Sequence, residues 1–291
     1  MPKKGYHIIA PGSVLVDHGP VHMTISAWRE GRPEDGAAEA GAKTAIRLLA
    51  QLARRLDIAR QPVERLTSAP SRGTPRVLRR MIRAVAQLDQ GDVTPMAAVA
   101  GAFSDMVKEK VVLEGADRVI VNNGGDIALC RGREKQPVRI GMVSDLNDGR
   151  VTHVVDLPGS SDGCHVEGVA TSGFGGRSLT KGIASAVTCF ARSSALADAA
   201  ATAVANATTC DHPEIERCPA EKIDALTDIR GHQVTCRIGK LSPTAISQAM
   251  AGGIERARQL HDREMIAAAI IFIQHQAGIW PPEFARFVRT C

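Results

Sequence analysis

Three segments of the sequence combine residue types that could bind a phosphate or a metal ion. The first is the run Val121-Asn122-Asn123-Gly124-Gly125-Asp126-Ile127. Its two glycines allow the backbone to approach a ligand, and its amide and carboxylate side chains supply hydrogen-bond donors and acceptors. Because the run lies between apolar segments, it is also typical of a β-hairpin turn, and from these residues alone the turn is the simpler interpretation.

The second segment is the run Ala195-Leu196-Ala197-Asp198-Ala199-Ala200-Ala201-Thr202. On a helix, Asp198 and Thr202 lie four residues apart and therefore share one face. A carboxylate and a hydroxyl so placed could hold a hard cation such as Mg²⁺, which leaves coordination positions for phosphate oxygens and water. The structural alternative is that Asp198 complements the helix dipole and Thr202 bonds back to a carbonyl.

The third segment is the run Thr171-Ser172-Gly173-Phe174-Gly175-Gly176-Arg177-Ser178, at the end of a predicted strand. Its hydroxyl groups and backbone N–H groups could bind a phosphate, with Arg177 supplying positive charge. The alternative is an ordinary flexible loop.

The elements that must position these segments follow from hydrophobic period and capping residues. Apolar residues at helical spacing predict a helix over about 37–56, and Thr-Pro pairs at Thr74-Pro75 and Thr94-Pro95 predict two helix starts, each with an N-cap and a first-turn proline. Two more helices are expected over Ser194 to Asn206 and Pro243 to Leu260. Strands are expected at 118–122, 127–130, 138–143, 151–157, 166–171, 185–191 and, closing the chain, 265–273. Helices at both ends around a central run of strands predict the α+β class.

Composition limits the functional classes further. The chain has 291 residues with 44% apolar and 23% charged residues, which favours a folded globular protein, and we expect one domain over residues 1–291. Aromatic residues make up only 3% and the net charge of +5 is scattered, which argues against a nucleic-acid partner.

The same sequence predicts a cytoplasmic protein without a membrane partner. No signal-peptide core follows the basic segment Met1 to His7, and the longest apolar run, Ile266 to Ile273, is too short to cross a bilayer. The seven cysteines are irregularly spaced, which is typical of free thiols in a reducing compartment.

Taken together, the three segments resemble the ApbE-like proteins, which include the FAD:protein FMN transferases. The chain is most similar to a shorter branch of that superfamily, the uncharacterised UPF0280 group, through the further run Thr94-Pro95-Met96-Ala97-Ala98-Val99-Ala100-Gly101-Ala102. The resemblance is best over about residues 74–210 and implies an ApbE-like (T-fold-type) domain with a central, mostly antiparallel sheet flanked by helices.

The resemblance also implies a flavin-nucleotide pocket, for FAD or FMN, beside a Mg²⁺ site. It assigns the metal to Asp198, Thr202 and a backbone carbonyl at Val99, and the nucleotide to the residues Met96, Ala97, Ala98, Asn123, Gly124, Gly125, Asp126, Thr171, Ser172, Gly173, Arg177 and Ser178. In the reaction that the family catalyses, Mg²⁺ neutralises a pyrophosphate while a hydroxyl of an acceptor protein attacks the FMN-side phosphorus.

Two departures from the family pattern leave the activity open. The transferases carry a Lys-Gly pair where this chain has Ala100-Gly101, and a His followed by Asp-Pro where it has the run Arg177 to Gly182. Arg177 or Lys181 could replace part of the missing positive charge. The alternatives are a non-catalytic flavin-binding or cofactor-delivery protein, and an enzyme acting on a different small substrate.

Weaker candidates stay open beside these. Cys210, His212 and Cys218 could supply zinc ligands but lack a fourth, and Asp17 with His18 and His22 could form a polar cluster near the pocket. The small-residue helix near Pro95 would pack equally well within a monomer or across a homodimer.

Overall fold

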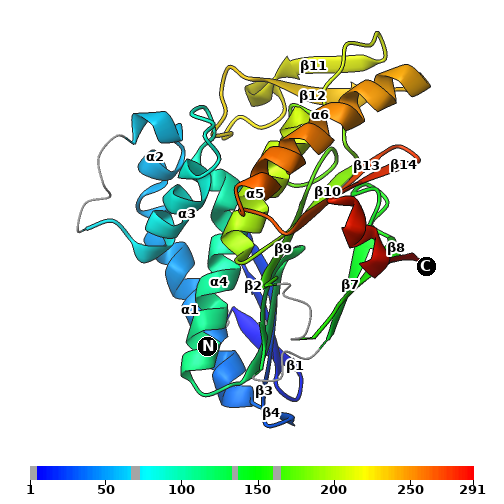
Figure 1. Cartoon of the computed structure of the whole chain (residues 1–291). Coiled ribbons are helices and arrows are strands. Elements are labelled where there is room, and N and C mark those ends of the chain that lie inside the picture. Colours follow the sequence, from blue (N-terminus) through cyan, green and yellow to red (C-terminus); the bar gives the residue numbers. More distant parts are fainter. Residues whose placement is uncertain (1–4, 67–72, 133–136, 160–164) are drawn as a thin grey trace.

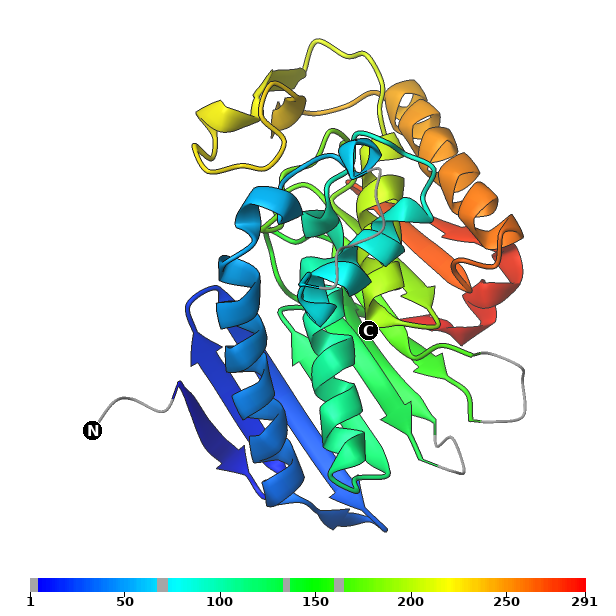
Figure 2. The ribbon, with the colours of Figure 1, turned by 90° about the vertical axis from the view of Figure 1, so that its left-hand side faces the viewer.

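Three layers make up the protein in the computed structural model, which describes residues 5–66, 73–132, 137–159 and 165–291 (Figure 1). Helices cover one face of a large sheet (Figures 1 and 2), and a three-stranded sheet packs on the other face (Figure 1). The described strand pairs of the large sheet are antiparallel, in the order β1-β2-β3-β5-β6-β9-β10-β13-β14 with β4 beside β3. The fold is therefore α+β with a central antiparallel sheet, as predicted.

The strands of the large sheet are β1 (Tyr6–Ala10), β2 (Ser13–His18), β3 (Val21–Arg29), β4 (Arg32–Pro33), β5 (Arg118–Asn123), β6 (Asp126–Arg131), β9 (Gly168–Ser172), β10 (Ala186–Ala191), β13 (Ala268–Ile273) and β14 (Gln276–Trp280). The smaller sheets are formed by β7 (Val138–Val143), β8 (Val151–Leu157) and β15 (Val288–Thr290), and by β11 (Ile215–Pro219) and β12 (Gln233–Ile238).

The α-helices are α1 (Asp35–Ala53), α2 (Leu56–Ala59), α3 (Arg76–Ala86), α4 (Val99–Leu113), α5 (Ser194–Ala207) and α6 (Pro243–Asp262). Short 3₁₀ helices are η1 (Val63–Arg65), η2 (Pro95–Ala98), η4 (Ala220–Lys222) and η5 (Pro282–Phe287). No helix in the described part of the chain is long and apolar enough to span a bilayer.

The beginning of the chain differs from the prediction. The helix predicted over about 37–56 is α1, but the strands β1, β2 and β3, which were not predicted, precede it and form one end of the large sheet. Two of their apolar residues, Ile8 and Ile9, are exposed, and polar residues alternate with apolar ones along β3. These strands lie at the edge of the sheet or present one face to solvent, so they lack the continuous apolar run that marked the central strands.

Three element boundaries also differ. The segment predicted as the closing strand is β13, but two more strands follow it. β14 pairs with β13 in a hairpin, and β15 pairs with β8. Residue Thr74 is not the cap of α3, since Pro75 holds an extended conformation (ψ 143°) and the helix begins at Arg76. At the next predicted start, Thr94 caps as expected by accepting a hydrogen bond from Met96 N (3.3 Å), but the chain first forms η2 and becomes α-helical only at Val99.

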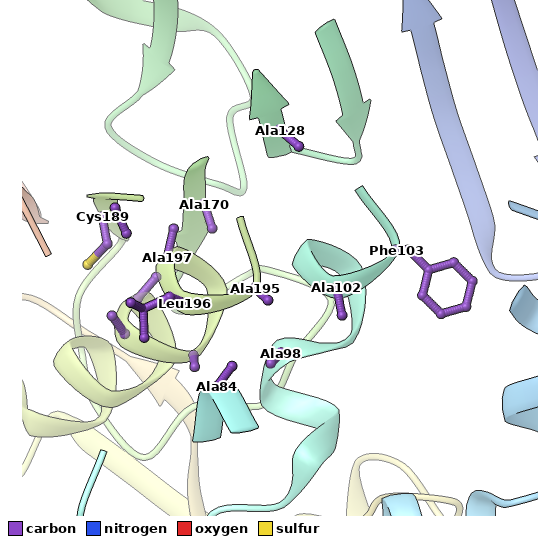
Figure 3. Close-up of a cluster of buried hydrophobic side chains, with 14 of the residues drawn as sticks. Ala84, Ala98, Ala102, Phe103, Ala128, Ala170, Cys189, Ala195, Leu196 and Ala197 are labelled. Carbon is purple, nitrogen blue, oxygen red and sulfur yellow. The ribbon is translucent and has the colours of Figure 1, made fainter. Parts of the chain in front are cut away.

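Alanine is the commonest residue in the core beneath the helices. Figure 3 shows Ala84 of α3, Ala98 and Ala102 around the start of α4, and Ala195 and Ala197 of α5 gathered in one buried cluster. Side chains this small allow helix backbones to approach closely, since little volume separates their axes. The start of α4 is thereby held directly against the start of α5.

Candidate functional site

The helices α4 and α5 cross at a contact that only glycine permits. A Cβ atom added to Gly101 would lie 2.2 Å from the carbonyl oxygen of Ser194, which is backbone and cannot rotate away. The first turns of the two helices therefore touch, and residues one turn further along each helix reach the N-terminus of the other.

At this crossing, one aspartate of each helix accepts hydrogen bonds from the N-terminus of the other helix. The Asp198 Oδ2 atom on α5 accepts a hydrogen bond from Gly101 N on α4 (3.0 Å). Conversely, the carboxylate of Asp105 on α4 accepts from Ser194 N and Ala195 N on α5 (both 3.0 Å). Each helix thus satisfies free N–H groups of the other and places a negative charge at its positive end. The structural role expected for Asp198 is real, but it serves α4 rather than its own helix.

The hairpin between β5 and β6 docks onto the same place. Its turn residues, Gly124 and Gly125, have φ angles of 66° and 109°, and Gly125 N donates to Asn122 Oδ1 (2.8 Å), which confirms the predicted turn. The Asn123 amide nitrogen lies 3.4 Å from the Ala100 carbonyl oxygen, to which it donates. The Ser104 hydroxyl donates to the Asp126 carbonyl oxygen (2.8 Å). The turn is therefore held against the N-terminus of α4.

This docking places two acidic side chains within electrostatic reach of each other. Burial, and then the negative charge of Asp198, raise the pKa of Asp126, while Arg177 lowers it. Burial is also the main cause that raises the pKa of Asp198 to about 7, with Asp105 adding to it and two α4 N–H groups opposing it. Among the described residues, Asp126 Oδ1 is buried without a hydrogen-bond partner. A cation bound here would stabilise the charged forms of both carboxylates and would give the unpartnered oxygen of Asp126 a partner.

A cavity of about 210 Å³ opens beside this cluster. Six residues predicted for the site line it, namely Met96, Ala97, Val99, Arg177, Ser178 and Thr202. The Gly124 turn lies against Arg177, since a Cβ added there would be 3.0 Å from Arg177 Nη2. The structure thus brings together the end of η2, the start of α4, the face of α5 and the loop after β9.

The other predicted residues do not line the cavity. Asn123, Gly124, Gly125, Asp126 and Asp198 form the cluster beside it, and Ala98 is fully buried in the core. Of the Thr-Ser-Gly segment, Thr171 lies 2.9 Å from Thr188 through their hydroxyl oxygens within the sheet, and Ser172 ends β9 opposite Val187. Gly173 packs its backbone against Ala184 and Ala186, so this segment supports the loop that carries Arg177 and Ser178.

Sequence reasoning missed several residues that line the cavity. The Lys181 ammonium, considered only as a replacement charge, forms an ion pair with Asp92 (2.7 Å). The Thr94 hydroxyl donates to the carboxylate of Asp228, in a segment between η4 and β12 that supplies one wall of the cavity. That segment and Asp92 contain no recognisable motif, so only the fold brings them to the site. The capping spacing of Thr94 was visible, but its partner 134 residues away was not.

The weaker candidates are placed elsewhere. The Asp17 and His22 side chains lie 3.9 Å apart on an exposed part of the β2–β3 hairpin. Within the ranges that the structure describes, no group of three or more His, Cys, Asp or Glu side chains is arranged to hold a metal ion. The Asp198 site is a different kind of arrangement, in which a hydroxyl and a carbonyl would join the carboxylates.

Comparison with known proteins identifies the family. A family model described as "AbpE bacteria" matches residues 6–279. A UPF0280 protein of Methanosarcina barkeri is 36% identical over 158 residues, which cover 54% of this chain and 58% of the relative. A UPF0280 protein of Methanococcus vannielii is 32% identical over 200 residues, covering 65% and 77%. The match spans little more than half the length of the M. barkeri relative.

The similarity to solved structures is weaker. The Pseudomonas stutzeri flavinyl transferase ApbE, in its apo form, has 16% identity and a TM-score of 0.48, with 91% of this chain and 92% of that chain covered. The ApbE protein of Thermotoga maritima has 14% identity and a TM-score of 0.41, with 98% and 99% covered. Because the family model covers most of the chain and the M. vannielii relative is matched over more than two thirds of its length, the chain belongs to the UPF0280 family of ApbE-like proteins.

Proposed function

We propose that this chain binds a flavin nucleotide, or a closely related nucleotide, together with Mg²⁺ where α4, α5 and the β5–β6 hairpin meet. The observation that carries the proposal is the pair Asp126 and Asp198. Burial raises the pKa of both carboxyl groups, the charge of Asp198 further raises that of Asp126, and one oxygen of Asp126 has no partner among the described residues. Such a pair is costly to bury unless a positive charge compensates it.

The residues present fit a magnesium site. Asp198, Thr202 and the carbonyl group of Val99 would hold the ion, and the unpartnered oxygen of Asp126 would face it. Few protein ligands are needed, since Mg²⁺ keeps water and phosphate oxygens in its coordination shell. When bound, the ion would neutralise the negative charge of a pyrophosphate group.

The cavity walls supply the groups for the phosphate side of the ligand. Arg177 and Lys181 bring two positive charges, and Ser178 a hydroxyl, onto the loop that follows β9. Arg177 can present its planar guanidinium group to two phosphate oxygens at once. The Lys181 ammonium is held by Asp92, which fixes its place at the cavity wall.

Flavinyl or phosphoryl transfer to an acceptor protein is the reaction that such a site would support. The acceptor hydroxyl would attack the FMN-side phosphorus of FAD and form a new phosphorus–oxygen bond. The bond from that phosphorus to the bridging oxygen would break, AMP would leave with the bridging oxygen, and the hydroxyl proton would be released. The names of the distant structural neighbours include a flavinyl transferase. The acceptor protein would be the partner, and a homodimer remains a prediction.

A second candidate is binding without transfer, or a smaller substrate. The cavity of about 210 Å³ is smaller than the roughly 300–1,000 Å³ usual for sites that enclose a drug-sized ligand. It would therefore enclose only part of a dinucleotide. The Lys and His of the transferases are also absent from the matching positions, where Ala100 and the Arg177–Gly182 loop stand.

The test uses the absorbance spectrum and native mass of the purified chain before and after addition of FAD and Mg²⁺. A flavin spectrum and a matching mass gain are expected, and AMP release distinguishes transfer or hydrolysis from binding alone. A colourless protein with unchanged mass would contradict flavin binding. The variant Thr202→Val should weaken binding, whereas Thr209→Val, a matched change at an exposed position, should not.

The proposed location is a reducing compartment such as the cytoplasm. The six cysteines in the described ranges are free thiols, namely Cys130, Cys189, Cys210, Cys218, Cys236 and Cys291. Free thiols persist where glutathione and thioredoxin keep them reduced, which supports the proposal.

A further inference from the structure

A second cavity, of about 550 Å³, lies on the other side of the α4–α5 crossing and shares no lining residue with the first. Six cationic side chains line it, namely Arg76, Arg79, Arg80, Arg83, Lys108 and Arg192. We call this cavity the α3 cleft, because four of the six come from that helix.

The sequence of α3 explains the stripe of positive charge. Its arginines lie at positions 76, 79, 80 and 83, a spacing that places them on one face, while Val77, Leu78, Met81, Ala84 and Val85 are buried on the other. The helix contains no acidic residue, so nothing within it offsets the repulsion between neighbouring guanidinium groups. Packing alone requires only the apolar face and gives no reason for arginine at all four positions.

The acidic residues of the cleft neutralise only part of this charge. Arg80 forms a short ion pair with Glu109, and Lys108 pairs with Glu167 (2.8 Å). The Asp105 carboxylate is occupied by the N–H groups of Ser194 and Ala195. Within the described residues, Arg76, Arg79 and Arg83 have no acidic partner within 4.0 Å.

The chemistry of the cleft favours an extended, strongly charged anion. Arginine binds phosphate through two parallel hydrogen bonds. Arg76 and Arg83 are seven residues apart, which on a helix is about 10 Å, so the row of arginines is longer than a single phosphate group and matches an extended anion. None of the described residues that line the cleft is aromatic, so these residues offer no surface on which a base or flavin ring could stack.

We propose that the α3 cleft binds a linear oligophosphate, through Arg76, Arg79 and Arg83. The site is separate from the proposed nucleotide site, because the two cavities share no lining residue in the described part of the chain. It requires no metal, since the guanidinium groups supply the neutralising charge.

Titration calorimetry of the full chain with tripolyphosphate, at physiological ionic strength and with EDTA present, tests the proposal. We expect saturable binding of tripolyphosphate. The double variant Arg79→Gln/Arg83→Gln should lower the affinity about tenfold or more, because it removes two guanidinium groups that would each donate charged hydrogen bonds to the ligand. The matched control is Arg32→Gln/Arg54→Gln, which removes the same charge from exposed positions that do not line the cleft. Its affinity for tripolyphosphate should stay within about twofold of that of the wild type. Circular dichroism of both variants checks that they fold.

Three results would overturn the proposal. The first is no saturable binding of tripolyphosphate by the wild type. The second is equal weakening by the control variant, which would mean that net charge alone attracts the anion. The third is inorganic phosphate binding as tightly as tripolyphosphate, because a row of arginines about 10 Å long predicts tighter binding of an extended anion. Unchanged tripolyphosphate binding in the variant Asp198→Asn supports a site separate from the first cavity.

Discussion

At the scale of single residues, Asp198 combines two roles, capping of α4 and the proposed binding of a cation. Its Oδ2 atom caps α4 through Gly101 N (3.0 Å), and its charge lies next to that of Asp126. Capping needs only a hydrogen-bond acceptor, whereas holding a cation needs negative charge. Asparagine keeps the first property and loses the second, so this substitution separates the two roles.

We therefore predict that Asp198→Asn keeps the fold and loses Mg²⁺. The amide oxygen can still accept from Gly101 N, and removal of a buried negative charge beside Asp126 relieves repulsion. Mg²⁺ affinity measured by calorimetry should fall about tenfold or more, with the thermal midpoint equal to or above that of the wild type without metal. The control is Asp57→Asn, an exposed aspartate of α2. An unchanged Mg²⁺ affinity in Asp198→Asn would remove Asp198 from the metal site.

At the scale of elements, the site depends on how closely α4 and α5 approach. The hairpin β5–β6 and the loop after β9 are arranged around this crossing, and Gly101 is the residue that permits it. The crossing brings Asp105 and Asp198 to the opposite helix ends, so the capping and the carboxylate cluster have one common geometric cause.

The variant Gly101→Ala should separate the two helices. Its Cβ would lie 2.2 Å from the Ser194 carbonyl oxygen, so the backbone must shift, and a loss of about 1–3 kcal/mol in the free energy of unfolding is expected. Chemical denaturation measures this loss. The matched control is Gly36→Ala in α1, where no atom lies within 4 Å of the added Cβ and the helix should gain up to about 0.5–1 kcal/mol. Equal stability of Gly101→Ala and the wild type would contradict the proposed contact.

Elements with a strong hydrophobic period could be predicted from the sequence. Strands β7 and β8 begin and end where the sequence placed them, and α5 begins at Ser194 as expected and ends one residue later. In contrast, β1 to β3 were missed. Their apolar residues do not form a continuous run, because β2 and β3 bury alternate residues only and Ile8 and Ile9 of the edge strand β1 are exposed.

At the scale of the whole molecule, the site combines segments that are far apart in the sequence. The three chemical segments could be found because each contains its functional residues within eight positions. Three other features of the site could not be predicted from the sequence, because they arise only from the packing of distant elements. They are the reciprocal capping by Asp105, the Asp92–Lys181 ion pair and the cavity wall around Asp228. The expectation of one domain over residues 1–291 stays a prediction.

The same packing makes the stability of the metal-free protein depend on pH. Burial raises the pKa values of Asp105, Asp126 and Asp198, the last to about 7. Above pH 4 the unfolded chain has released these protons, whereas the folded chain still holds that of Asp198 until pH approaches 7. In this window the folded state binds more protons than the unfolded state, so the free energy of unfolding falls as pH rises.

We predict that this fall is seen most clearly as the difference between the wild type and Asp198→Asn, with EDTA present. Between pH 5 and 7 the wild type should lose free energy of unfolding relative to the variant, with a limiting slope of about 1.4 kcal/mol per pH unit. Carboxylates whose pKa is lowered, such as Glu255 with a pKa of about 2, do not titrate in this window and cancel in the difference. Urea unfolding at a series of pH values gives the slope, and a difference that is flat or rises with pH would show that Asp198 is ionised throughout. Added Mg²⁺ should then stabilise the wild type more at pH 7 than at pH 5, because a cation competes with the proton for the same carboxylate.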